Sequence, residues 1–359
     1  MARKRPLSQL RIAVLGATRA GLPLALLLAD KGHHVVLVEK DAKALAALRA
    51  GRYPYLEPGG AELLLSCADS LRFSSEMSAV KGCQLIILMV STSVDRRLLP
   101  ETTALDTAVA ELRGTLHGGE TVVLRASVFP GTCQRLQEML PQVSLAFCPE
   151  RLASGHVLKE LQTVPQLVAG SDEARRVVSQ AFDFVELIEM ELVEAEVATL
   201  FLNAWRYVSF GTANQFFHIA VSKGLDFQKI RAAICYRYER ADGFPNSGFT
   251  AGPRLYQDMM QLAAYCNSFS LGNAAMLVNE TMPDSLLEHA KQKLKRSLKG
   301  LRCGILGMAF KAGSDDAADS LAFKLRSLLL REGANVSCSD AHISAADFVS
   351  QEALLKNLG

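Results

Sequence analysis

A short glycine-containing turn near the start of the chain has the spacing of a phosphate-binding loop. Gly16 closes the apolar run at residues 11–16, and Gly21 follows it in the segment GATRAG. The first glycine permits a tight turn and the last permits close packing of the next helix on its strand. Because helix amino ends attract anions, the turn predicts a site for the pyrophosphate of a dinucleotide. Glu39 ends the next apolar run, where a carboxylate accepts the ribose 2′-hydroxyl, and this favours NAD over NADP.

The middle of this turn leaves two interpretations open. Thr18 stands where a glycine would let the backbone approach the phosphates, so its side chain costs clearance. Its hydroxyl, with Arg19 beside it, is also able to contact the phosphates. Lys40 and Arg19 leave a minor case for NADP. The alternative is a vestigial dinucleotide fold that binds nothing.

A sheet must position these residues. The sequence predicts a strand at 11–16, a helix ending at Gly32 and a second buried strand from His34 to Asp41. Further strand candidates lie at residues 85–90, 121–127 and 144–147. Helical segments separate them, as in a largely parallel sheet. The predicted fold class is α/β, with an N-terminal Rossmann-like, NAD-binding domain at residues 1–190.

The rest of the chain predicts two further parts. A helical stretch without proline at about 192–223 opens a central helical domain at residues 191–295. We expect this helix to connect domains and to pack against its counterpart in a second copy, which predicts a homodimer. The alternative is a core helix of a single chain. Residues 296–359 repeat the strand, glycine turn, helix and second strand, so we expect a truncated Rossmann-like domain with two strands.

Composition excludes several classes of function. The net charge of the 359 residues is +2, with acids and bases interspersed, so we expect neither nucleic acid nor a membrane surface as partner. The basic start at residues 2–5 is interpreted as a solvated tail. The eight cysteines show no CxxC or Cys/His spacing, which predicts no metal site and a reducing compartment, the cytoplasm. The seven histidines form no recognisable catalytic triad.

Several segments resemble the UDP-glucose/GDP-mannose dehydrogenase family, the nucleotide-sugar dehydrogenases, from Arg11 to about His342. They are GATRAGLPLA, YLEPGGAELL, SVFPGT, CPERLASG, PQLVAG, EVATLFLN and GILGMAFKAGSDD. Each is short, but their order and spacing are specific. The resemblance implies NAD-dependent oxidation of a sugar-nucleotide alcohol to an acid, in two hydride transfers, through a cysteine thiohemiacetal and thioester. It also implies that residues 296–359 are of the nucleotide-sugar-binding type.

The chain departs from the family at the implied catalytic cysteine, where it has Arg254. A guanidinium stays protonated and forms no thiohemiacetal. The family's helix lysine, four residues before the retained Asn203, is Thr199, whereas Asp258 is retained. Two roles for Arg254 stay open. It binds an anionic group or a developing oxyanion, or it fills a disused pocket and pairs with Asp258 or Glu150.

Other residues implied by the resemblance are partly retained. Ser127 replaces a threonine and keeps a hydroxyl, Thr92 is kept, and Glu150 is the glutamate of the family's PE pair. Lys311 is kept in AFK, but the arginine that follows the aspartate pair in the family is Ala318 here. Loss of that arginine weakens the case for a nucleotide diphosphate.

Two functions therefore stay open. The first is a divergent NAD-dependent oxidoreductase acting on CH–OH, with a single hydride transfer on a sugar nucleotide or a smaller polar alcohol. The second is a catalytically inactive pseudoenzyme kept for NAD binding or partner interaction. The candidate catalytic residues are Ser127, Glu150, Asn203, Arg254 and Asp258. The candidate cofactor residues are Gly16, Thr18, Arg19, Gly21, Glu39, Lys40, Thr92 and Ser127, and the candidate substrate residues are Glu150, Arg254 and Lys311.

Overall fold

The computed structural model describes residues 9–358 apart from residues 96, 98 and 267, so the basic start at residues 2–5 lies outside it. The chain divides into two compact units, Met1–Phe201 and Leu202–Gly359. The predicted three-domain division at 190 and 295 stays a prediction. Within the described residues, no helix combines the length and the apolar character needed to cross a membrane.

The first unit is built on one eight-stranded sheet with the order β10-β9-β8-β7-β4-β1-β2-β3. The strands are β1 (Arg11–Leu15), β2 (His34–Val38), β3 (Leu71–Ser74), β4 (Leu85–Leu88), β7 (Thr121–Leu124), β8 (Ser144–Phe147), β9 (Gln166–Gly170) and β10 (Leu187–Met190). A separate antiparallel pair joins β5 (Ser93–Val94) to β6 (Pro100–Glu101). In the large sheet every neighbouring pair is parallel except β8 and β9. The largely parallel α/β sheet is thus confirmed, with one reversal of direction that the sequence did not indicate.

Strands β2, β4 and β7 end two or three residues before their predicted ends. The residues beyond the observed ends are 39–41 after β2, 89–90 after β4 and 125–127 after β7, so apolar character accounts only for the extension of β4. These loops hold the candidate site residues.

Helices cover both faces of this sheet. They are α1 (Gly21–Asp30), α2 (Ala42–Arg49), α3 (Gly60–Ser66), α4 (Thr103–Arg113), α5 (Thr132–Met139), α6 (Val157–Thr163) and α7 (Asp172–Ala181), with a 3-10 turn η1 (Met77–Val80). Residues of α1, α3, α6 and α7 share one apolar core with the sheet. Residues of α4, α5 and the first turn of α8 share a second apolar core with the sheet. The sheet is therefore the middle of three layers, buried on both faces as parallel sheets usually are.

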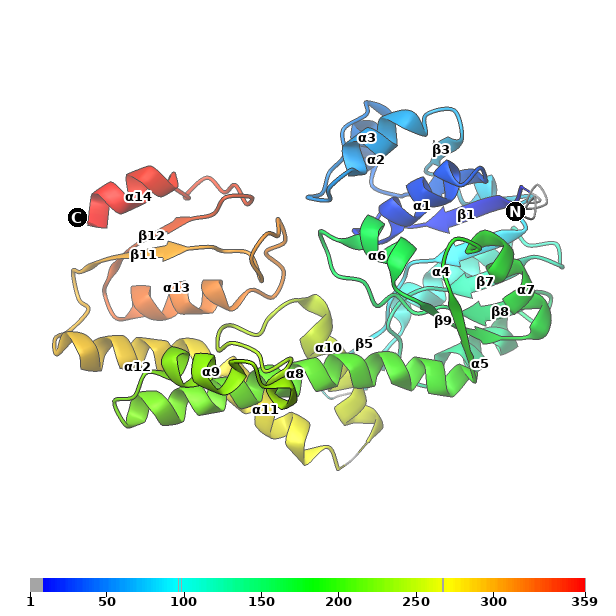
Figure 1. Cartoon of the computed structure of the whole chain (residues 1–359). Helices are drawn as coiled ribbons and strands as arrows, with labels where there is room; N and C mark the ends of the chain where they lie inside the picture. Colours follow the sequence, from blue (N-terminus) through cyan, green and yellow to red (C-terminus); the bar gives the residue numbers. More distant parts are fainter. Residues whose placement is uncertain (1–8, 96, 98, 267, 359) are drawn as a thin grey trace. The chain divides into compact units, whose positions relative to one another are not determined.

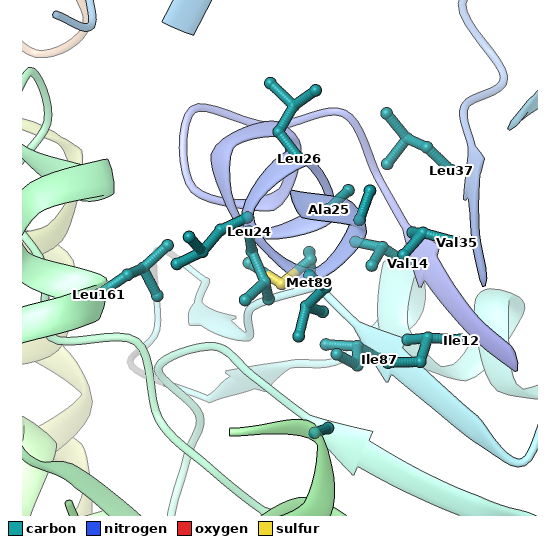
Figure 2. Packing of buried hydrophobic residues seen from close by; sticks show 14 of the residues in the cluster. Ile12, Val14, Leu24, Ala25, Leu26, Val35, Leu37, Ile87, Met89 and Leu161 are labelled. Carbon is teal, nitrogen blue, oxygen red and sulfur yellow. The ribbon is translucent and has the colours of Figure 1, made fainter. Parts of the chain in front are cut away.

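Helix α1 is the centre of the first core because it is apolar all round. Its side chains from Gly21 to Ala29 are all buried. Figure 2 shows Leu24 of α1 close to Leu161 of α6, with Val14 and Ile87 of the sheet beneath the helix. Close packing of α1 fixes the position of the turn at residues 16–20, which leads into it.

The second unit contains most of the long helix α8 (Leu192–Ser222), which crosses the boundary at residue 201. The other elements are α9 (Phe227–Cys235), the 3-10 turn η2 (Glu239–Ala241), α10 (Pro253–Tyr265), α11 (Ser270–Glu280), α12 (Met282–Leu294), β11 (Arg302–Leu306), α13 (Leu321–Arg331), β12 (Asn335–Ser339) and α14 (Gln351–Leu358). The predicted helices at about 192–223 and near residue 255 are thus present, and so are the two predicted strands.

Strands β11 and β12 pair in parallel. In Figure 1 they lie between α13 and α14, and α13 also packs on α12. A core of residues from these elements, with Ile305 and Met308 buried at its centre, makes this part a small α/β layer structure. It repeats the strand, turn, helix and strand of the first unit.

Candidate functional site

The glycine turn of the first unit has the geometry that its sequence predicts. Gly16 has a φ of +109°, a conformation that favours glycine, and its N–H donates to Val38 O at 2.8 Å. A Cβ on Gly21 would lie 2.2 Å from the carbonyl oxygen of Gly16, so only glycine fits at the start of α1. The first turn of α1 contains no acidic residue. The positive end of this helix is therefore available for an anion.

Glu39 directly contacts the turn. One carboxylate oxygen accepts from the N–H of Ala17 at 2.8 Å and the other from the N–H of Asp41 at 2.9 Å. A carboxylate has about four lone-pair positions, so these two bonds leave capacity for ribose hydroxyls. Glu39 lies where a dinucleotide fold requires its ribose acceptor.

The side chains of Thr18 and Arg19 in the turn, and of Lys40 after β2, contact other residues of the protein. The Thr18 hydroxyl accepts from Gly21 N–H at 3.0 Å, which turns it toward the helix. The Arg19 guanidinium lies 4.8 Å from the centre of the Tyr55 ring, and Tyr55 itself donates to Ala17 O at 2.6 Å. Lys40 Nζ lies 2.6 Å from a carboxylate oxygen of Glu111. Arg19 and Lys40 thus have partners other than a 2′-phosphate, which agrees with NAD.

Three further candidates follow strands of the same sheet. Thr92 follows β4, Ser127 follows β7 and Glu150 follows β8, and all three are nearly fully buried. Thr92 N–H donates to Ser127 O at 3.2 Å, so these two loops are in contact. Glu150 accepts from Leu152 N–H, within its own loop. Since β1, β2, β4, β7 and β8 run in parallel, Glu39 and these three residues share one sheet edge.

In the second unit, Asn203 and Asp258 are in direct contact. The Asn203 amide nitrogen donates to one oxygen of the Asp258 carboxylate at 2.6 Å, and the Gln261 amide donates to the other at 3.2 Å. Asn203, Asp258 and Gln261 are all buried. Arg254 is half-buried in the first turn of the same helix, one turn before Asp258. Residues four apart share a helix face, so Arg254 and Asp258 belong to one face of α10.

Thr199 cannot substitute for a lysine at its position on α8. It is buried, and its hydroxyl donates to the carbonyl of Ala195 one turn earlier at 3.3 Å. A threonine hydroxyl is uncharged near neutral pH and is a much weaker base than an amine, so it does not replace a lysine. The structure therefore offers no amine at this position.

Lys311 lines a cavity of about 640 Å³ at the carboxyl ends of β11 and β12. Asp340 also lines this cavity, and it accepts from the N–H groups of Met308 and Ala309 at 2.6 and 3.0 Å. Burial alone would raise the pKa of Asp340, but four hydrogen bonds from backbone amides outweigh it and lower that pKa. Asp340 repeats the contact of Glu39 with its glycine turn. The volume lies within the usual range for small-molecule sites.

The site residues fall into two groups, one in each unit. The first unit brings together Gly16, Thr18, Arg19, Gly21, Glu39, Thr92, Ser127 and Glu150 at one sheet edge. The second unit holds the Asn203–Asp258 pair, Arg254 and Lys311. Lys40 points to Glu111 and is exposed.

Sequence reasoning missed two buried glutamates that organise the first unit. Glu57, in the segment YLEPGG, accepts from Leu158 N–H at 2.9 Å at the start of α6. Glu196 on α8 accepts from Gly131 N–H at 2.6 Å and from Cys133 N–H at 2.7 Å. Both are acidic residues within apolar segments, and this pattern was the only sequence signal that they are buried. The neighbouring residues in the chain do not indicate which helix amino end each glutamate binds.

Comparison with known proteins agrees with this geometry. Residues 10–185 match the UDP-glucose/GDP-mannose dehydrogenase family, NAD binding domain. The match confirms NAD as the predicted cofactor, and the turn with Glu39 fits it. UDP-N-acetyl-D-mannosamine dehydrogenase of Methanocaldococcus jannaschii is 24% identical over 348 residues, which cover 94% of this chain and 80% of the relative.

Two solved structures share the fold. UDP-D-ManNAc dehydrogenase from Pyrococcus horikoshii superposes with a TM-score of 0.87 at 24% identity, covering 96% of this chain and 86% of the other. A UDP-glucose dehydrogenase from Pyrobaculum islandicum gives a TM-score of 0.87 at 23% identity, covering 100% and 86%. These structures show the shared fold. The match of residues 10–185, together with the relative that covers 94% of this chain, shows that the chain belongs to the UDP-glucose/GDP-mannose dehydrogenase family.

Proposed function

We propose that this protein is an NAD-dependent oxidoreductase that makes one hydride transfer on the alcohol of a sugar nucleotide or a similar polar alcohol. The observation that carries the proposal is the Asn203–Asp258 contact, with Arg254 one turn away on the same helix. A buried carboxylate held by two amides is a suitable acceptor for an alcohol proton. In this reaction the C–H hydride passes to NAD, the O–H proton passes to Asp258, and an aldehyde or ketone forms.

Arg254 and Thr199 are the reason for limiting the reaction to one transfer. Further oxidation of an aldehyde through a thioester requires a thiolate, which Arg254 does not provide. Removal of such a nucleophile costs roughly 10⁴ to 10⁶ in rate. A single hydride transfer forms no covalent intermediate, so it does not depend on that group.

Two cationic side chains, those of Arg254 and Lys311, favour a substrate that carries a negative charge. Arg254 is half-buried beside the Asn203–Asp258 pair, where a guanidinium binds a carboxylate or phosphate or stabilises a developing oxyanion. Lys311 lines the cavity next to β11 and β12. The relatives named above act on sugar nucleotides according to their names, which makes this class of substrate the first to test.

We also propose that the protein forms a homodimer through α8. Trp205, Phe216 and Ile219 are exposed by 63%, 47% and 51%. At 3.6 residues per turn they fall within an arc of about 60° on the helix. A two-fold dimer presents the same surface from both copies, so one apolar helix face suffices. The cytoplasm stays the predicted location, and all eight cysteines are free thiols.

The decisive experiment is calorimetric titration of the folded protein with NAD, NADH and NADP, followed by a substrate screen with UDP-N-acetylmannosamine and UDP-glucose. We expect NAD or NADH to bind in preference to NADP. We also expect one equivalent of NADH per substrate molecule, with an aldehyde or ketone as product. Formation of the acid with two equivalents would refute the single transfer. Absence of dinucleotide binding would instead support the pseudoenzyme alternative, a fold kept for partner interaction.

A further inference from the structure

The amino end of α5 is held by a carboxylate from a distant part of the chain. The N-cap residue of α5, Gly131, has no side chain and adopts a φ of +93°. Glu196, on α8, supplies the acceptors instead, at 2.6 Å from Gly131 N and 2.7 Å from Cys133 N. It is 1% exposed. A buried carboxylate at a helix amino end forms strong hydrogen bonds because it is charged and faces the positive end of the helix dipole.

Hydrogen bonds lead from this cap to the candidate cofactor residues. Thr132, next to the two capped amides, donates through its hydroxyl to Phe129 O at 2.6 Å. Phe129 N–H donates to the Thr92 hydroxyl at 2.7 Å. Thr92 N–H donates in turn to Ser127 O at 3.2 Å. The backbone of residues 127–133 is thereby fixed at both ends, by Glu196 at one and by Thr92 at the other.

From this arrangement we propose that Glu196 is a positioning residue for the NAD site, one that orients Thr92 and Ser127 without touching the dinucleotide. The proposal rests on the proposed function in so far as Thr92 and Ser127 contact NAD. Loss of the carboxylate leaves two buried N–H groups without acceptors, and such groups are costly. The backbone of residues 127–133 is then free to shift, and the two hydroxyl residues lose their fixed geometry.

The side-chain chemistry explains why a glutamate is required. Each carboxylate oxygen accepts from one amide. Burial, and after it the neighbouring Glu196 carboxylate, raises the pKa of the Cys133 thiol. Glutamine of the same shape has only one acceptor oxygen, and its NH₂ group would face an N–H group. Glu196→Gln therefore keeps the volume and removes the double cap.

The test compares Glu196→Gln with Glu194→Gln, an exposed residue on the same helix, in the full chain. We expect Glu196→Gln to raise the Kd for NAD about tenfold, the equivalent of one charged hydrogen bond. Amide hydrogen exchange should accelerate in residues 127–136 and 90–94, and sugar-nucleotide affinity should not change. Glu194→Gln should match the original protein in all three measurements. Glu196→Asp, whose carboxylate is one methylene shorter, should show an intermediate effect.

The outcomes separate the inference from the proposed function. If the unaltered protein binds no NAD, the proposed function fails, while faster exchange in residues 127–136 of Glu196→Gln still supports the cap. If Glu196→Gln equals Glu194→Gln in both NAD affinity and exchange, the inference is overturned. If Glu196→Gln does not fold, Glu196→Asp provides the test. NAD affinity and hydrogen exchange of Glu196→Asp equal to those of the unaltered protein would overturn the inference.

Discussion

The amide nitrogen of Asn203 lies 2.6 Å from the carboxylate of Asp258, although 55 residues separate them in the chain. Asp258 is 2% exposed and takes a second hydrogen bond from Gln261. The pair therefore joins α8 to α10 and presents a fixed carboxylate beside Arg254. In the proposed reaction this carboxylate accepts the alcohol proton.

Replacement of Asn203 by alanine should destabilise the protein and weaken turnover together. The Asp258 carboxylate would stay buried with one hydrogen-bond donor fewer, a loss of about 1–3 kcal/mol. The measurement is urea unfolding, with hydride transfer followed by the absorbance of the reduced nicotinamide. Asn273→Ala, at an exposed position on α11, is the control and should change neither value. Equal stability of the two variants would contradict the structural role of the pair.

Gly21→Ala should abolish tight NAD binding. The added Cβ would lie 2.2 Å from Gly16 O, and backbone atoms at that distance must move. We expect a loss of about 1–3 kcal/mol in stability from overpacking, and a Kd for NAD at least ten times higher. Gly248→Ala is the matched control, since a Cβ there meets nothing within 4 Å. Unchanged affinity in calorimetry would show that the turn does not hold the dinucleotide.

Arg254→Cys should not restore oxidation to the acid. A thiol at this position still lacks the nearby amine, because Thr199 offers only a hydroxyl bonded to Ala195 O. The product, identified by mass spectrometry, should remain at the aldehyde or ketone level with one NADH formed. The double variant Arg254→Cys with Thr199→Lys should be measured alongside, because it carries both the thiol and the amine. Acid formation by the single variant would mean that the second residue is dispensable.

Trp205→Glu should convert the proposed dimer to a monomer. A charge at the centre of an apolar contact between two copies has no partner there, and its burial is costly. Sedimentation velocity measures the mass directly. Arg206→Glu, also exposed on α8 but about 100° around the helix, should leave the dimer intact. A monomeric unaltered protein, or a dimeric Trp205→Glu variant, would contradict the α8 interface.

The protein should lose stability as the pH falls from about 7 to 5, in part because of His33. Burial lowers the pKa of His33, an effect that nearby Asp183 only partly opposes. Its Nδ1 accepts from Leu10 N–H at 3.2 Å, which requires a neutral ring. The unfolded chain binds the proton first, near pH 6.5, so stability begins to fall there and continues to fall down to the lowered folded pKa.

The check on His33 is the melting temperature between pH 7 and 5. His33→Asn keeps an acceptor but does not titrate, so its melting temperature should fall less over this range. His117→Asn, at an exposed histidine, should behave like the unaltered protein. Parallel curves for all three proteins would exclude His33 as a cause.

Local sequence patterns predicted β1, β2, β4, β7 and β8 of the first unit, β11 and β12 of the second, and the residue types of the site, whereas β3, β9 and β10 were not predicted. The strand, glycine turn, helix and strand at residues 11–38 and again at 302–339 could be read locally, because apolar periodicity and glycine constraints act over a few residues. The segment matches identified the family for the same reason. They also located Arg254 and Thr199, since those positions are fixed by neighbours in the chain.

Tertiary structure alone decided which of these residues touch. The reversal at β9, the pairing of Lys40 with Glu111, the Asn203–Asp258 bond and the cap from Glu196 all join segments far apart in the chain. Such contacts depend on the direction of each side chain after packing, and many pairings of polar residues are compatible with the same local patterns. The energy of burying an apolar core selects one packing, and this packing determines the partner of each buried polar group.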